Sequence, residues 1–197
     1  MPRAFRAIAL AAGVAVVLAA CSDPFAPRPR DTTVTTRFAI GALNAPLPGV
    51  PSVWRIGSLA TFRLDSLPAQ FDLGFDLLPD GRVRVIPAAK VVASIPALAG
   101  QALHRVALLP VAGGFDALTI APERGYLIDS LQVVSPGQVL AVRTESDFCS
   151  NDPNGRRELY AKFVIDSTNT TSRRIFINTT VVRSCGYRSF LDTLPAR

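Results

Sequence analysis

Proline and glycine recur so closely along residues 37–197 that little room is left between them for a long helix. The apolar residues between these breaks mostly recur at every second position, which is the period of a strand with one buried face. The one segment with a helical tendency, residues 95–104, is interrupted by Pro96 and Gly100. We therefore predict about ten to twelve short strands and no long helix.

Residues 70–87, QFDLGFDLLPDGRVRVIP, form the clearest predicted hairpin. Alternation places four apolar side chains on the core face of its first strand: Phe71, Leu73, Phe75 and Leu77. Asp72 and Asp76 then fall on the solvent face, where Arg82 or Arg84 of the returning strand can pair with them. Pro79-Asp80-Gly81 supplies the turn, with Gly81 in the left-handed conformation.

Two further hairpins are predicted, and several short runs complete the set. One hairpin spans residues 126–144 with a type II turn at residues 135–138, and the other spans residues 158–182. The shorter β-rich runs are residues 37–43, 52–56, 59–65, 89–95, 103–110 and 115–120. Strand lengths vary and several runs are apolar on both faces, which favours an antiparallel β-sandwich over an up-and-down barrel.

The first 20 residues differ from the rest of the chain. Arg3 and Arg6 precede an apolar run over residues 7–18, and Ala19-Ala20 follows it directly before Cys21. A basic start, a short apolar core and a small-residue exit are typical of a secretory signal peptide. The run is shorter than the roughly 20 apolar residues that a membrane-spanning helix needs.

The sequence Leu18-Ala19-Ala20-Cys21 resembles the lipobox of bacterial lipoproteins. This resemblance implies that the Cys21 sulfur takes a diacylglycerol, and that the chain is cut just before Cys21 and acylated there. Ser22 implies, by the same resemblance, transport to the outer membrane, facing the periplasm or the cell surface. Two or more acyl chains anchor a protein firmly, so we expect the lipid bilayer to be a partner through acylated Cys21.

The domain organisation follows from these features. We predict a signal peptide at residues 1–20, a lipidated Cys21 with a proline-rich tether at residues 21–36, and a single sandwich domain at residues 37–197. The tether favours an extended conformation at about 3.1 Å per residue, long enough to hold the domain up to roughly 45 Å from the bilayer. About 177 residues remain after cleavage, which suits one domain.

The charge of the processed chain is modest. The full sequence has 21 basic residues, and two of them lie in the leader, so 19 basic residues remain against 15 acidic ones, for a net charge of +4. The surplus is not gathered into one patch, and an exported protein rarely meets nucleic acid. We expect no nucleic-acid partner.

Cys149 and Cys185 are the two cysteines left once Cys21 carries lipid. The compartment that the resemblance implies is oxidising, and paired cysteines there usually form a bridge. We therefore predict a disulfide between them, with two buried free thiols as the alternative.

Binding and metal sites have weak sequence signals. The candidate ligand-binding aromatics are Trp54, Tyr126, Tyr160 and Tyr187, although such residues also pack sandwich edges. Oxygen donors between residues 147 and 154 form a weak calcium candidate: Asp147, Asn151, Asp152 and Asn154. These residue types also make ordinary turns. His104 is the sole histidine, so neither a catalytic triad nor a zinc site is expected.

The sequence indicates a location more strongly than an activity. The leading hypothesis is a non-enzymatic envelope lipoprotein with a structural or protein-interaction role and an envelope protein as partner. A module for a small ligand or glycan is the alternative, and a hydrolase comes third because no nucleophile motif is present. No cofactor is predicted.

Overall fold

The computed structural model describes residues 33–64, 70–94 and 103–191. The chain divides into two units, Met1–Arg30 and Asp31–Arg197, and every described residue belongs to the second unit. Cys21 and the leader therefore lie outside the described residues. The first strand begins at Thr33, so four residues predicted to belong to the tether are part of the sandwich.

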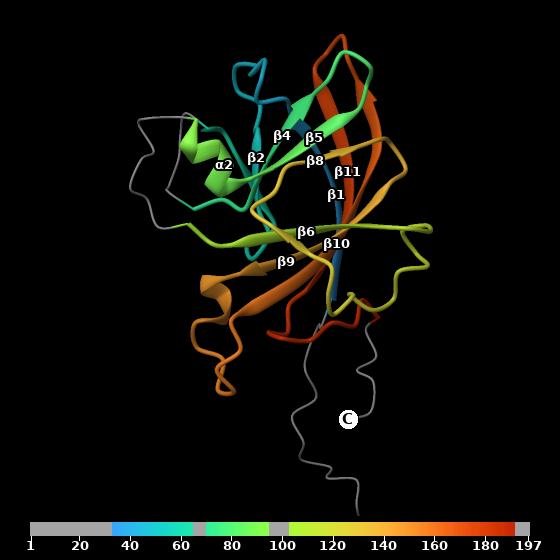
Figure 1. The fold of residues 1–197 in the computed structure, drawn as a ribbon. Coiled ribbons are helices and arrows are strands. Elements are labelled where there is room, and N and C mark those ends of the chain that lie inside the picture. Colours follow the sequence, from blue (N-terminus) through green and yellow to red (C-terminus); the bar gives the residue numbers. More distant parts are fainter. Residues whose placement is uncertain (1–32, 65–69, 95–102, 192–197) are drawn as a thin grey trace, which may run out of the picture. The chain divides into compact units, whose positions relative to one another are not determined.

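Eleven strands of the described chain form two antiparallel sheets, which confirms the predicted fold class (Figure 1). The six-stranded sheet has the order β1 (Thr33–Gly41), β11 (Arg174–Val182), β10 (Glu158–Asn169), β9 (Val139–Glu145), β6 (Val106–Val111), β7 (Leu127–Ile128). The five-stranded sheet has the order β3 (Ala60–Phe62), β2 (Val53–Arg55), β4 (Leu73–Leu77), β5 (Val83–Pro87), β8 (Gln132–Val134).

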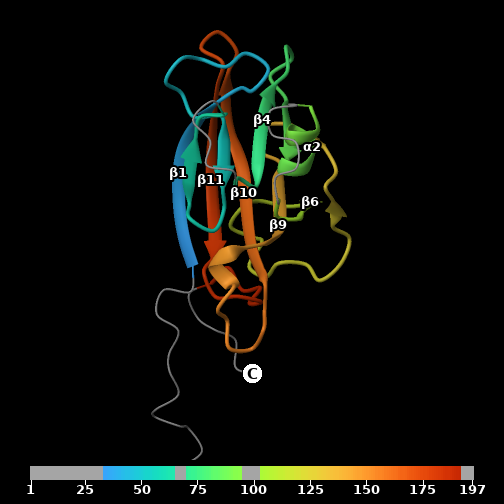
Figure 2. The same ribbon diagram turned by 90° about the vertical axis from the view of Figure 1, so that its left-hand side faces the viewer.

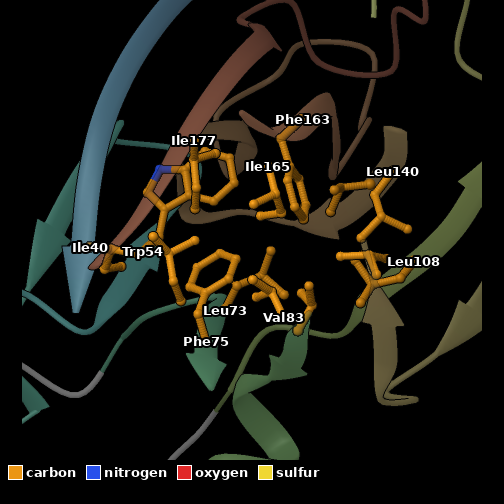
Figure 3. Packing of buried hydrophobic residues seen from close by; sticks show 14 of the residues in the cluster. Ile40, Trp54, Leu73, Phe75, Val83, Leu108, Leu140, Phe163, Ile165 and Ile177 are labelled. Carbon is orange, nitrogen blue, oxygen red and sulfur yellow. The ribbon is translucent and has the colours of Figure 1, made fainter. Parts of the chain in front are cut away.

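The core lies where the inner faces of the two sheets meet (Figure 3). Phe163 of β10 lies between two aromatic side chains of the other sheet, with its ring centroid 6.0 Å from those of Trp54 and Phe75. Both ring pairs meet edge to face, an arrangement that stabilises beyond simple burial. Alternation along each strand places these residues inward, so the sequence pattern and the core agree.

Two of the short runs predicted as strands are not strands. Ala88–Ala93 form the helix α2, whose buried residues Ala88, Val91 and Val92 recur at helical spacing. They pack on the outer face of the five-stranded sheet, and Figure 2 shows α2 on the side of β4 that faces away from β10. The run at residues 115–120 contributes only an isolated bridge from Ile120 to Ser189. Residues 95–102 lie outside the described residues.

The predicted hairpin at residues 70–87 is present, with Leu73 opposite Pro87 and Leu77 opposite Val83. Leu73, Phe75 and Leu77 face the core as predicted. Phe71 is buried too, but it joins a second cluster with Val53 and α2. The chain bends at Asp72, which interrupts the alternation one residue before β4 begins.

The prediction that Asp72 and Asp76 face solvent is wrong. Asp72 turns inward at the bend and is 1% exposed, while Asp76 is 8% exposed. Asn44 covers Asp76, and its backbone N–H donates to the carboxylate at 2.9 Å. Arg84 lies directly opposite Asp76 with 3.5 Å between nitrogen and oxygen, which is one of the predicted pairs. β4 is therefore buried on both of its faces.

The other two predicted hairpins have different outcomes. Residues 158–182 form the expected hairpin, in which β10 pairs with β11. Residues 126–144 do not, because β8 and β9 belong to different sheets. The predicted turn exists, with Gly137 at φ 85° and a hydrogen bond from Gln138 N–H to the Ser135 carbonyl at 3.1 Å. It carries the chain from one sheet to the other.

Gly81 closes the β4–β5 turn at φ 81°, a conformation that β-branched residues resist. We expect Gly81→Val to lower the free energy of unfolding by about 1–2 kcal/mol, measured by urea denaturation. Gly114→Val is the control, since a Cβ at Gly114 meets no atom within 4 Å and its φ lies outside the left-handed region. Equal losses in the two variants would contradict a conformational cause.

Candidate functional site

Two of the four predicted ligand-binding aromatics are buried. Trp54 is 0% exposed in the core, so its proposed role at a binding surface is wrong. It faces inward because Trp54 pairs with Leu73 and shares the core face of the five-stranded sheet. Tyr160 is 7% exposed on the outer face of β10, and its hydroxyl donates to Glu158 Oε2 at 2.9 Å.

Tyr126 and Tyr187 are half-buried beneath arginine side chains. The guanidinium carbon of Arg143 lies 5.3 Å from the Tyr126 ring centre, and that of Arg156 lies 4.9 Å from the Tyr187 ring centre. Burial raises the pKa of the Tyr126 phenol, so this group stays protonated. These cation–π contacts occupy the faces that a sugar or peptide would stack on.

The loop at residues 147–154 does not gather its oxygen donors. Asp147 begins the 3-10 helix η3 (Asp147–Cys149) and faces Arg55 at 3.3 Å. Asp152 instead accepts the backbone N–H groups of Asn154 and Arg156, each at 3.0 Å, and so closes a turn. Asn151, like Asn154, is exposed. Within the described ranges, no three acidic, histidine or cysteine residues are grouped as a metal site would require.

The predicted disulfide is confirmed. Cys149 and Cys185 are bonded, with their Cα atoms 5.7 Å apart. The bridge joins the end of η3 to the loop that follows β11.

His104 lies between two carboxylates. Its Nδ1 is 3.6 Å from Asp72 Oδ1, and its Nε2 is 3.2 Å from Asp147 Oδ1. The Asp72 carboxylate, and after it the Asp147 carboxylate, raise the pKa of His104 against the opposing effect of burial. Asp72 also accepts from the Ile56 N–H at 2.6 Å and from the Thr144 hydroxyl at 2.8 Å, so it links the two sheets. Each imidazole nitrogen therefore faces a carboxylate oxygen.

A hollow of about 490 Å³ lies on the outer face of the five-stranded sheet. Its lining comes from β4, β5, α2 and the segments beside them: Leu43, Asn44, Leu64, Asp76, Arg84, Ile86, Lys90, Val91, Ser94 and Leu131. Small-molecule sites have this size and this mixture of apolar walls with a few polar groups. This surface is our candidate functional site, and we refer to it as the outer hollow.

Gly74 allows two lining residues of the outer hollow, Leu43 and Val91, to lie close to the sheet. It lies in the middle of β4, where a Cβ would collide with Leu43 Cδ1 and come within 3.2 Å of Val91 Cγ2. The missing side chain lets both residues settle directly on the sheet.

The described residues that line the outer hollow are positively charged on balance. Asp76 is neutralised by Arg84, while Lys90 is exposed and forms no ion pair with another residue of the described chain. The Asp76 carboxylate already accepts the Asn44 backbone N–H, so one of its oxygens has a partner within the protein.

An apolar edge lies beside the outer hollow. Leu127, Ile128, Leu131 and Val133 are 51, 43, 50 and 45% exposed, and together we call them the β7–β8 edge. β7 ends the six-stranded sheet and β8 ends the five-stranded one. At the opposite end of the six-stranded sheet, β1 exposes Thr35 and Arg37 instead. Sequence reasoning missed this edge and the outer hollow, since both depend on which sheet each short strand joins.

Comparison with known protein families, with curated proteins and with solved structures finds no match. No helix in the described part of the chain is both long and apolar enough to cross a bilayer.

Proposed function

We propose that this protein is a non-enzymatic envelope lipoprotein that is anchored through acylated Cys21 and docks another envelope protein on the β7–β8 edge. The observation that carries the docking role is the exposure of four large aliphatic side chains between residues 127 and 133. The anchor rests on the leader and lipobox of the sequence.

Edge strands are usually protected by charge, proline or a covering loop, because an open edge promotes association. The β7–β8 edge carries four exposed apolar side chains within seven residues of the chain instead, and groups of exposed apolar residues are typical of interaction surfaces. β7 has two residues and β8 has three, so little backbone is available for strand addition. The side chains must therefore supply most of the binding energy, at about 1.5–3 kcal/mol for each one fully buried.

The surroundings of His104 favour a non-enzymatic role. Its two ring nitrogens face Asp72 and Asp147, and the Thr144 hydroxyl donates its hydrogen bond to Asp72. A hydrolase based on this histidine would need a nucleophile in place of one of those carboxylates. Ligand binding is the second candidate function, and the outer hollow is the observation that favours it.

Site-specific photocrosslinking in the native cell tests the proposal. A photoreactive amino acid placed at Leu127 or Val133 should crosslink to one and the same envelope protein. At Phe176, which is 41% exposed on β11, it should not. The intact mass of the purified protein should correspond to a chain that begins at acylated Cys21.

Introducing a charge at the surface provides the matched comparison. Val133→Lys should abolish the crosslink from Leu127, since burying an unpaired ammonium is costly, whereas Phe176→Lys should leave it unchanged. The docking role fails if crosslinks from Leu127 and Val133 reach unrelated proteins or match those from Phe176. The anchor fails if the chain begins at Ser22 or later, or if Cys21 is unmodified.

A further inference from the structure

We propose that the outer hollow binds an amphipathic anion, namely an aliphatic chain that ends in a single carboxylate or phosphate group. This inference stands apart from the docking role, because it rests on the cavity and its charges rather than on the exposed edge. Leu131 is the one residue that the two surfaces share.

The walls of the outer hollow suit an aliphatic chain. Leu43 and Val91 lie over Gly74, Ile86 belongs to β5, and Leu64 and Leu131 complete the apolar part of the lining. None of these five side chains carries a polar atom. A ligand with a polar or sugar-like body would leave its hydroxyl groups unpaired against them, which costs binding free energy.

The charges of the outer hollow suit an anionic head. The Arg84 side chain is 43% exposed, and its one ion-pair partner in the described chain is Asp76, at 3.5 Å. A guanidinium has five N–H donors, so Arg84 keeps donors for a second anion. Lys90 on α2 adds a positive charge that no carboxylate of the described chain balances. A cationic head would meet two positive side chains and a carboxylate that is already satisfied by Asn44 and Arg84.

Calorimetric titration of the processed chain with Cys21→Ser tests this inference, since that chain keeps every residue of the sandwich. Straight-chain carboxylates of increasing length are added below their micelle concentrations. Each added methylene should tighten binding about fourfold until the outer hollow is filled, after which the affinity levels off. The alcohol of the same length should bind about two- to fivefold more weakly, and the alkylammonium more weakly still.

Variants separate the two parts of the site. Lys90→Gln should weaken carboxylate binding about two- to fivefold and leave alcohol binding unchanged. Leu131→Ala should weaken both ligands, and it is safe for folding because Leu131 is half exposed. Arg124→Gln, an exposed arginine outside the lining, is the control and should change neither.

The remaining outcomes are equally decisive. Monomeric lysophosphatidylglycerol binding in place of carboxylates would identify a lipid headgroup as the anion, and carboxylates alone would identify a free fatty acid. Equal affinity for carboxylate and alkylammonium would overturn the inference, as would binding that neither Lys90→Gln nor Leu131→Ala changes. Magnetic-resonance contacts between Leu131 and residues 95–102 would show that the chain itself occupies the site and would also overturn it.

Val133 does not line the outer hollow, so failure here leaves the docking test with Leu127 and Val133 intact.

Discussion

The double variant Cys149→Ser, Cys185→Ser is expected to melt about 8–15 °C below the parent protein. The bridge spans 36 positions of the sequence. Closing a loop of that length removes conformational entropy from the unfolded chain worth about 3.8 kcal/mol. A typical domain has a total stability of about 5–15 kcal/mol, so the loss should be large.

The position of the disulfide supports a structural role. Between the two cysteines run β10 and β11, which form the long central hairpin of the six-stranded sheet (Figure 1). The bridge therefore holds the two ends of this hairpin segment together at the side opposite its turn. Without it, η3 and the loop after β11 would rely on non-covalent contacts such as the hydrogen bond from Gly186 N–H to the Glu158 carbonyl at 2.8 Å.

Differential scanning calorimetry of the variant and the parent measures this effect. The parent with reductant should match the double variant, whereas Cys21→Ser with its bridge intact should melt like the parent. A shift below about 2 °C in the double variant would mean that the unfolded chain is already compact across this loop.

The fold class was predictable because it depends on local patterns. Alternating apolar residues locate β4, β5, β10 and β11 without reference to the rest of the chain, and Pro79-Asp80-Gly81 marks the turn between the first two. Assignment of a strand to a sheet is not local. Val134 and Val139 flank a predicted turn, and both are buried, so the pattern is satisfied equally by a hairpin or by two strands in facing sheets.

The candidate site was not predictable for the same reason. Asp72 and Asp76 have the spacing of solvent-facing residues, and only the bend at Asp72 and the cover from Asn44 bury them. Part of the lining of the outer hollow comes from α2. The β-branched pair Val91-Val92 made this helix resemble a strand in the sequence. Gly74 was the available signal, since a glycine inside a strand often marks a close approach of other groups.

Asp72→Ala is expected to lower the free energy of unfolding by about 2–4 kcal/mol. Asp72 is 1% exposed, and its loss would leave the Ile56 N–H without an acceptor. The Thr144 hydroxyl would keep an acceptor, because it also donates to the Glu145 carbonyl at 3.0 Å. Urea denaturation measures the change, and Asp147→Asn is the matched control because the Asp147 side chain is 54% exposed. An equal loss in the two variants would contradict the role of Asp72 as a buried link between the sheets.

Asp72→Asn removes the charge of Asp72 and keeps the shape of its side chain. We expect it to change how the free energy of unfolding depends on pH. The pKa of His104 is raised in the folded protein above its usual 6.5, first by the neighbouring Asp72 carboxylate. A raised histidine pKa adds stability that is present in full below the unfolded value and is lost as pH rises through the folded value. The parent should therefore lose stability between pH 6.5 and the folded pKa, whereas Asp72→Asn should show a weaker dependence because its His104 pKa is lower. Urea denaturation across this range, together with magnetic-resonance titration of the imidazole, measures both effects. If His104 titrates identically in the two proteins, Asp147 rather than Asp72 controls its charge, and the link between the sheets is independent of pH.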